Sequence, residues 1–164
     1  CTYQFEVLPD GSRFVFRGGV GDSPELRTRV ADASADIVTV GVGQPFSQLS
    51  FTLRPDSARV AWVSSGVFEI GDPGVAGESL VADGVRADTN FGWTATGARL
   101  VFVRDGDGGD ARTLRSFNEA TSTSTVVAQQ VRHWLVIPGR AQIAAETDFF
   151  GGGDKARLVI TTPP

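Results

Sequence analysis

Residues 90–127 read NFGWTATGARLVFVRDGDGGDARTLRSFNEATSTSTVV. Four short apolar or alternating runs, at 91–93, 99–103, 112–117 and 123–127, are separated by three segments rich in turn-forming residues. Alternation of apolar and polar side chains between turns is typical of a strand with one face buried. The stretch therefore predicts four consecutive antiparallel strands that form one β-meander.

The same outline recurs at three other places in the chain. The turn between the first and second strands is anchored at Pro9, Pro55, Ala95 and Pro138, at intervals of 46, 40 and 43 residues. Repeats of the WD40 type, each forming one four-stranded propeller blade, are about 40–45 residues long. The sequence predicts a single domain over 1–164 that consists of four such units, at approximately 2–41, 46–82, 89–128 and 131–162.

These units predict an all-β fold, a β-propeller of about four antiparallel four-stranded blades. The last blade is short of one strand, because only three runs follow residue 130. An immunoglobulin-like or jelly-roll β-sandwich is the alternative, since it also consists of short strands with frequent turns. Fifteen expected strands in 164 residues are too many for one pair of sheets, so the repeat favours the propeller.

Three of the turns carry a shared motif. Residues 9–16 read PDGSRFVF, residues 55–62 read PDSARVAW, and residues 94–102 read TATGARLVF. These segments resemble the S-P-D-G-x-x-I-A-F core of the WD40-like (PD40) repeat in TolB-type β-propellers. The third copy also has Phe91 and Trp93 where that family has an aromatic residue before the turn.

The fourth copy departs from this motif. Pro138-Gly139-Arg140 lacks the aspartate, and Ala144-Ala145 replaces the aromatic end. TolB-type propellers usually have six or more blades, whereas this chain supplies four. Three explanations stay open: a small four-bladed ring, a larger ring assembled from two chains, or a piece of a longer protein.

The last unit leaves a strand edge for which the sequence offers no partner strand. An unpaired edge exposes backbone donors and acceptors, which proteins normally cover. We expect a partner protein or another copy of the chain to bind there, at Arg157 and Val159. The terminal segments offer another closure, in which residues 3–8 pair beside residues 157–161. Phe149 and Phe150 border a glycine-rich loop and are a further expected contact patch.

Composition and charge exclude some classes of partner. The chain has 15 basic and 19 acidic residues and a net charge of −4, which disfavours nucleic acid as a ligand. No stretch approaches the roughly 20 apolar residues that span a bilayer. Membrane attachment is therefore expected only through a lipid.

Cys1 is the only cysteine and the first residue. It has two interpretations, the boundary of a cut chain or the lipidation site of a bacterial lipoprotein, which the chain resembles in beginning at the acylated cysteine. The second interpretation implies an extracytoplasmic location, in the periplasm, at the outer membrane or at the cell surface.

Residues with catalytic chemistry are few. His133 is the only histidine and lies in an expected strand, where packing or partial exposure is its ordinary role. The chain has no G-x-S-x-G, H-E-x-x-H or Cys-x-x-Cys motif. Peptidases with a related propeller keep their catalytic residues on a separate hydrolase domain. We therefore expect no catalytic residues and no enzymatic activity, and the carboxylates Glu6, Glu69 and Glu146 leave a carbohydrate-acting protein only as an alternative.

The acidic loop 105–110 is the one candidate metal site. Asp105, Asp107 and Asp110 could converge on Ca²⁺, because alternate carboxylates on a glycine-rich turn supply oxygen ligands. The spacing departs from an EF-hand loop, since the third carboxylate comes one position late. A solvated hairpin is the preferred interpretation, and no cofactor is expected.

Four arginines, Arg13, Arg59, Arg99 and Arg140, follow the first turns and are interpreted as one repeated blade position. The repeats and the TolB resemblance together predict a non-catalytic, extracytoplasmic propeller module that binds protein. The alternatives are a self-assembling protein, which completes its open blade edge with another chain, and a calcium-dependent or carbohydrate-acting protein.

Overall fold

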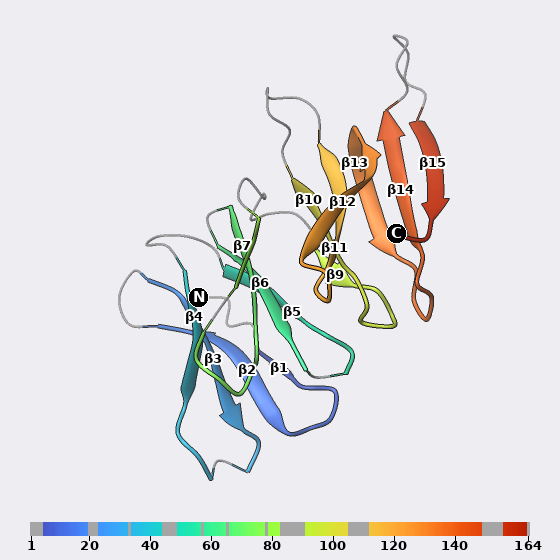
Figure 1. Cartoon of the computed structure of the whole chain (residues 1–164). Helices are drawn as coiled ribbons and strands as arrows, with labels where there is room; N and C mark the ends of the chain where they lie inside the picture. Colours follow the sequence, from blue (N-terminus) through green and yellow to red (C-terminus); the bar gives the residue numbers. More distant parts are fainter. Residues whose placement is uncertain are drawn as a thin grey trace. The chain divides into compact units, whose positions relative to one another are not determined.

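The computed structural model of the chain is all-β, with four antiparallel sheets (Figure 1). It describes residues 5–19, 23–32, 34–43, 49–56, 58–64, 66–77, 79–82, 91–104, 112–148 and 156–163. The chain divides into two compact units, Cys1–Ala87 and Asp88–Pro164. The expectation of one domain over 1–164 stays a prediction. No helix in the described part of the chain has the length and apolar character needed to cross a membrane.

The first unit contains two four-stranded sheets in which neighbours in sequence are neighbours in space. Sheet 1 has the order β1-β2-β3-β4, with β1 (Phe5–Val7), β2 (Arg13–Gly18), β3 (Glu25–Val30) and β4 (Val38–Val42). Sheet 2 has the order β5-β6-β7-β8, with β5 (Leu49–Leu53), β6 (Val60–Ser64), β7 (Val67–Gly71) and β8 (Ser79–Ala82).

The second unit contains one four-stranded and one three-stranded sheet. Sheet 3 pairs β9 (Gly92–Trp93), β10 (Leu100–Arg104), β11 (Thr113–Asn118) and β12 (Thr123–Gln129) in sequence order. Sheet 4 pairs β13 (Val131–Val136), β14 (Ile143–Asp148) and β15 (Ala156–Thr161). Four separate meanders, the last with three strands, confirm the expected set of blades and exclude the β-sandwich.

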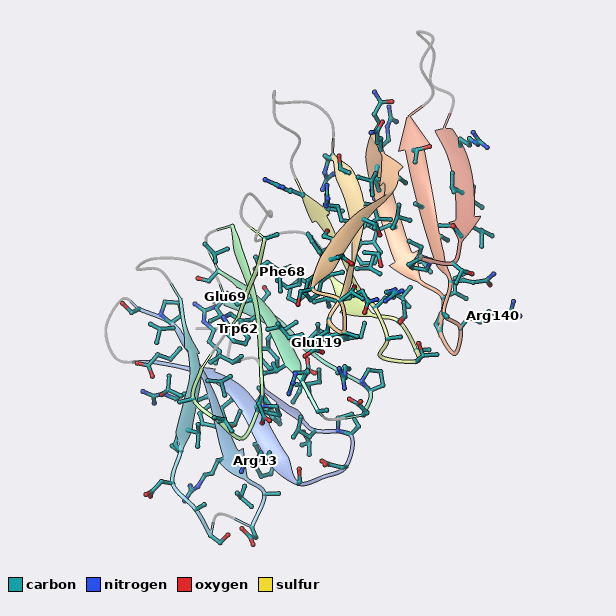
Figure 2. All side chains as sticks on the ribbon, viewed as in Figure 1. Arg13, Trp62, Phe68, Glu69, Glu119 and Arg140 are labelled. Atoms are coloured by element: carbon teal, nitrogen blue, oxygen red, sulfur yellow. The ribbon has the colours of Figure 1, made fainter. Side chains whose placement is uncertain are left out.

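A common hydrogen bond closes the turn between the first and second strands of every sheet. In each case a backbone N–H donates to a carbonyl five residues later at 2.9 Å, and the pairs are Leu8 with Arg13, Arg54 with Arg59, Thr94 with Arg99, and Ile137 with Gln142. The equivalent of Arg13, Arg59 and Arg99 is therefore Gln142. Arg140 lies two positions earlier, exposed on the turn itself (Figure 2), so its assignment to the repeated position is wrong.

The aspartate of the motif holds the turn in shape. The Asp10 carboxylate accepts bonds from the Ser12 N–H at 2.9 Å and the Ser12 hydroxyl at 2.7 Å, and Asp56 accepts from the Ala58 N–H at 3.0 Å. Such side-chain bonds to the backbone two residues later explain why Asp suits this position. In the fourth copy Gly139 replaces it and adopts a φ of +73°, which a non-glycine residue rarely adopts.

Sheets 1 and 2 pack face to face around Trp62. The shared core consists of Leu8, Val15, Leu26, Val40, Leu49, Phe51, Val60 and Trp62. A second link is polar, since the buried Thr28 hydroxyl on β3 donates to the Pro73 carbonyl, which follows β7, at 2.5 Å. Glycine permits the close approach of the two sheets, because a Cβ atom at Gly41 would lie 2.4 Å from the indole of Trp62.

Sheets 3 and 4 pack in the same manner within the second unit. Their shared core consists of Val101, Val103, Leu114, Val131, Ile143 and Ala145, with Trp134 and Val136 packed against it. Side chains alternate between the two faces of a strand, so these contacts show which face of each sheet is covered.

Candidate partner-binding faces

Pairing register gives every sheet an equivalent set of residues on one face, which we call the forward face. In sheet 1 it carries Val15, Leu26 and Thr28, because Val15 pairs with Thr28 and Arg17 with Leu26. The equivalents are Ala61, Phe68 and Ile70 in sheet 2, Val101, Leu114 and Ser116 in sheet 3, and Ala144, Leu158 and Ile160 in sheet 4. The burial of each forward-face residue can therefore be compared with that of its equivalents in the other three sheets.

A bulge confirms that these positions are equivalent. The register of the third strand against the fourth shifts immediately after Leu26 in sheet 1, after Phe68 in sheet 2 and after Leu114 in sheet 3. Bulges re-aim side chains at defined places in a sheet. Leu158 occupies the same position on β15, where the described residues provide no fourth strand.

The forward face is buried in three sheets and open in the fourth. All nine equivalent side chains of sheets 1, 2 and 3 are buried. In sheet 4, Leu158 is 68% exposed and Ile160 is 57% exposed. Large apolar side chains that repeat core positions are thus presented to solvent on the last sheet, together with Leu135 on β13.

The opposite face, which we call the backward face, is buried in sheets 2, 3 and 4 and open in sheet 1. It carries Phe51, Val60 and Trp62 in sheet 2, Leu100 and Phe102 in sheet 3, and Ile143 and Ala145 in sheet 4, all of them buried. The equivalents of sheet 1 are Phe5, Phe14 and Phe16, joined by Val7 opposite Phe14. Phe5 is 67% exposed and Phe14 is 37% exposed, so this face is open.

Charged residues accompany both open faces. Glu146 pairs with Leu158 and with His133, which places all three on the open forward face of sheet 4. Arg27 pairs with Phe16, and Arg29 with Phe14, on the open backward face of sheet 1. The Arg27 guanidinium donates to the Glu25 carboxylate at 2.8 Å. The forward face of sheet 4 is therefore apolar with Glu146 and His133. The backward face of sheet 1 is apolar with Arg29 and with Arg27, whose charge is paired with Glu25 on the same face.

The expected partner residues on β15 lie beside the open face. Arg157 is exposed and pairs with Thr147, and Val159 is half-buried and pairs with Ala145 on the backward side. Their role in partner binding stays a prediction. Leu158 and Ile160, which alternate with them, were not predicted from the sequence, although counting along the third strand from the aligned turns identifies both.

Several expected site residues lie outside the described part of the chain. These are Cys1, Asp105, Asp107, Asp110, Phe149 and Phe150. The calcium, lipidation and loop-contact assignments that rest on them stay predictions. Among the residues that are described, no group of three His, Cys, Asp or Glu side chains could hold a metal ion.

The other residues considered for chemistry are distributed over separate strands. His133 is exposed on β13, Glu6 lies on β1, Glu69 on β7 and Glu146 on β14. Because Glu6, Glu69 and Glu146 belong to three different sheets, pairing register brings none of them opposite another. The one described cross-strand acid–base pair of side chains among them is His133 opposite Glu146.

Solved structures resemble the chain, whereas sequences do not. No protein-family model and no curated protein sequence matches it. TolB from Acinetobacter baumannii matches 98% of the chain with a TM-score of 0.65 and 11% identity. The chain has the fold of TolB-type β-propellers. An oligogalacturonate lyase in complex with manganese matches 96% of the chain at a TM-score of 0.65 and 11% identity.

Dipeptidyl peptidase 4 from Porphyromonas gingivalis matches 87% of the chain, with a TM-score of 0.65 and 14% identity. The chain spans only part of these proteins, namely 41% of TolB, 51% of the lyase and 28% of the peptidase. The resemblance in fold confirms the family likeness inferred from the turn segments at 9–16, 55–62 and 94–102.

The comparisons also correct one expectation. The expectation that the chain is not an enzyme is wrong, because structures with this fold include a lyase and a peptidase. The missing triad and zinc motifs excluded particular mechanisms, but a propeller scaffold hosts different chemistries in different proteins. TolB has the same fold as the lyase and the peptidase. The function of a protein with this fold therefore has to be argued from a particular site and not from the fold.

Proposed function

We propose that the chain is a β-propeller module that binds protein. The observation that carries this proposal is the open forward face of sheet 4, where Leu158 and Ile160 are exposed at positions that are buried in the other three sheets. Exposed apolar patches of this kind mark interaction surfaces.

The energetics favour covering this face. Full burial of one large aliphatic side chain stabilises by about 1.5–3 kcal/mol, and two such side chains stand side by side on β15. All six residues of β15 are paired with β14, so the main chain that carries them is already ordered before binding. A protein surface with its own apolar side chains is the matching ligand.

The proposed location is extracytoplasmic, with a lipid on Cys1 as the membrane attachment. The TolB-type repeats support this location by resemblance, and Cys1 supplies the chain's only thiol for acylation. Measurement of the intact mass after expression with a lipoprotein signal, compared with Cys1→Ser, tests the attachment. An acyl mass that is present in the Cys1 protein and missing in the variant is the expected result, and identical masses would contradict it.

Binding is tested by retention of envelope proteins on the immobilised chain. Leu158→Lys places a charge on the open face, on the edge strand β15. Val75→Lys places the same charge on a turn of sheet 2 and serves as the control, since Val75 is 60% exposed and Leu158 is 68% exposed. We expect the unmodified chain and the control to retain the same proteins and Leu158→Lys to lose them. Retention that is unaffected by Leu158→Lys would exclude this face as the binding site.

A further inference from the structure

We infer that the open forward face of sheet 4 binds the open backward face of sheet 1 in a second copy of the chain. This inference rests on the proposed function, because it names the protein that the forward face binds. It also gives a role to the open face of sheet 1, which the proposed function does not use.

Sheets of this chain pack in one defined way. In the core shared by sheets 1 and 2, Val15 and Leu26 on a forward face meet Phe51 and Trp62 on a backward face. In the core shared by sheets 3 and 4, the forward face again meets the backward face, for example Leu114 and Ile143. Each contact therefore joins a forward face to a backward face.

The two open faces repeat the residue types of these contacts. Leu158 corresponds to Leu26 and Leu114 by register, and Phe5 corresponds to Phe51. Aliphatic side chains on the forward face would again meet aromatic side chains on the backward face. A blade buries both of its faces only against a neighbour on each side. Each of the two open faces can supply the neighbour that the other needs.

The charges on the two open faces also favour this pairing. Glu146 occupies the position of Arg17, Val63 and Val103, and it gives the open forward face an acidic group. Arg29 lies on the open backward face, opposite Phe14. A forward face on a backward face brings Glu146 of one copy to the face that carries Arg29 in the other copy, so it joins opposite charges.

A two-chain assembly agrees with the number of blades in propellers. Twice the four sheets of one chain falls within the 4–8 blades typical of propellers. A head-to-tail contact closes as a ring or continues as a filament, according to the rotation between copies.

Two blocking variants test the inference. Phe5→Lys blocks the backward face and leaves the forward face intact, and Leu158→Lys does the opposite. Each variant alone has no pair of compatible faces, so native mass spectrometry is expected to show a monomer. The mixture is expected to give a one-to-one pair that does not grow further, whereas Val75→Lys should assemble as the unmodified chain does.

Three outcomes would overturn the inference: a monomeric mixture, a dimer of either variant alone, or an unmodified chain that stays monomeric. Both lysines replace exposed side chains, and unchanged circular dichroism and thermal unfolding show that each variant is folded. A monomeric chain that still retains an envelope protein through Leu158 would reject the second copy as partner and leave the proposed function intact. A monomeric chain that retains no envelope protein through Leu158 would reject both the second copy as partner and the proposed function.

Discussion

Replacing Gly41 by alanine is expected to weaken the packing of sheet 1 on sheet 2. A Cβ atom at Gly41 would stand 2.4 Å from Cζ2 and 2.6 Å from Cε2 of Trp62, closer than real Cβ contacts. The indole is rigid and fully buried, so it cannot turn into solvent to make room. Either β4 or the ring has to shift within a close-packed core.

The magnitude follows from two opposing effects. An extra methyl group in a well-packed core costs about 1–3 kcal/mol. Replacing glycine by alanine also restricts the unfolded chain, which stabilises the protein by about 0.4–1 kcal/mol where the backbone accommodates alanine. We therefore expect Gly41→Ala to lower the free energy of unfolding by about 1–2 kcal/mol.

Urea unfolding followed by circular dichroism measures this loss as a lower midpoint at unchanged slope. Gly92→Ala is the matched control, because its Cβ atom would meet only Cγ2 of Val136, at the ordinary contact distance of 3.9 Å. The control is expected to be as stable as the unmodified chain or slightly more stable. Equal midpoints for the two variants would refute the packing argument.

The contact can also be isolated by a second substitution. Trp62→Phe removes indole atoms that the new methyl group would meet, and it removes Nε1–H, which has no hydrogen-bond partner within the described residues. In this background the loss caused by Gly41→Ala should shrink by at least about 0.5 kcal/mol, as expected for residues in contact. Additive losses would show that the glycine and the tryptophan do not compete for space.

Two further predictions concern polar groups in the first unit. Thr28→Val leaves the Pro73 carbonyl without the hydroxyl that donates to it, so we expect a loss of about 1–3 kcal/mol in urea unfolding, whereas equal stability of Thr28→Val and Thr28→Ser would contradict it. Hydrogen bonding from Arg54 lowers the pKa of Asp56 from 3.8 to about 2, so this carboxylate stabilises the fold above pH 3.8 and stops doing so as the pH falls through about 2. The stability advantage over Asp56→Asn should therefore shrink between pH 5 and pH 2, and an unchanged advantage would count against this assignment.

Local patterns made most of the fold predictable. The apolar run 99–103 and the turns at 9–11 and 55–57 indicated short strands, and the near-constant spacing of the turns indicated repeated sheets. The structure explains that spacing, since the same N–H to carbonyl bond closes the turn in all four sheets.

The misassigned residue lies at the fourth turn, whose sequence differs from that of the other three turns. Arg140 was aligned with Arg13 because both follow a proline turn, but the fourth turn has its positive φ at Gly139 and not one residue later, as at Gly11. Hydrogen bonding therefore makes Gln142, and not Arg140, the equivalent residue. The spacing from the aligned turns also shows this shift, because Arg13 stands four residues after Pro9 whereas Arg140 stands two residues after Pro138.

The candidate faces were harder to predict, because exposure depends on which sheets are adjacent. Leu158 has the same residue type and register position as the buried Leu26 and Leu114. Only the structure shows that Leu158 is exposed while the other two are buried. The missing fourth strand pointed to the unpaired backbone edge of the last strand, and Arg157 and Val159 were predicted to bind a partner there. The surface that is open in the structure is instead the face of the sheet.

The mass of the unmodified chain in solution tests most directly whether the two open faces bind each other. Sedimentation velocity over a range of protein concentrations is the appropriate measurement, because assembly between copies depends on concentration. We predict a species of at least twice the 17.3 kDa of one chain that becomes more abundant as the concentration rises. A mass of 17.3 kDa at every concentration would show that the two open faces do not bind each other.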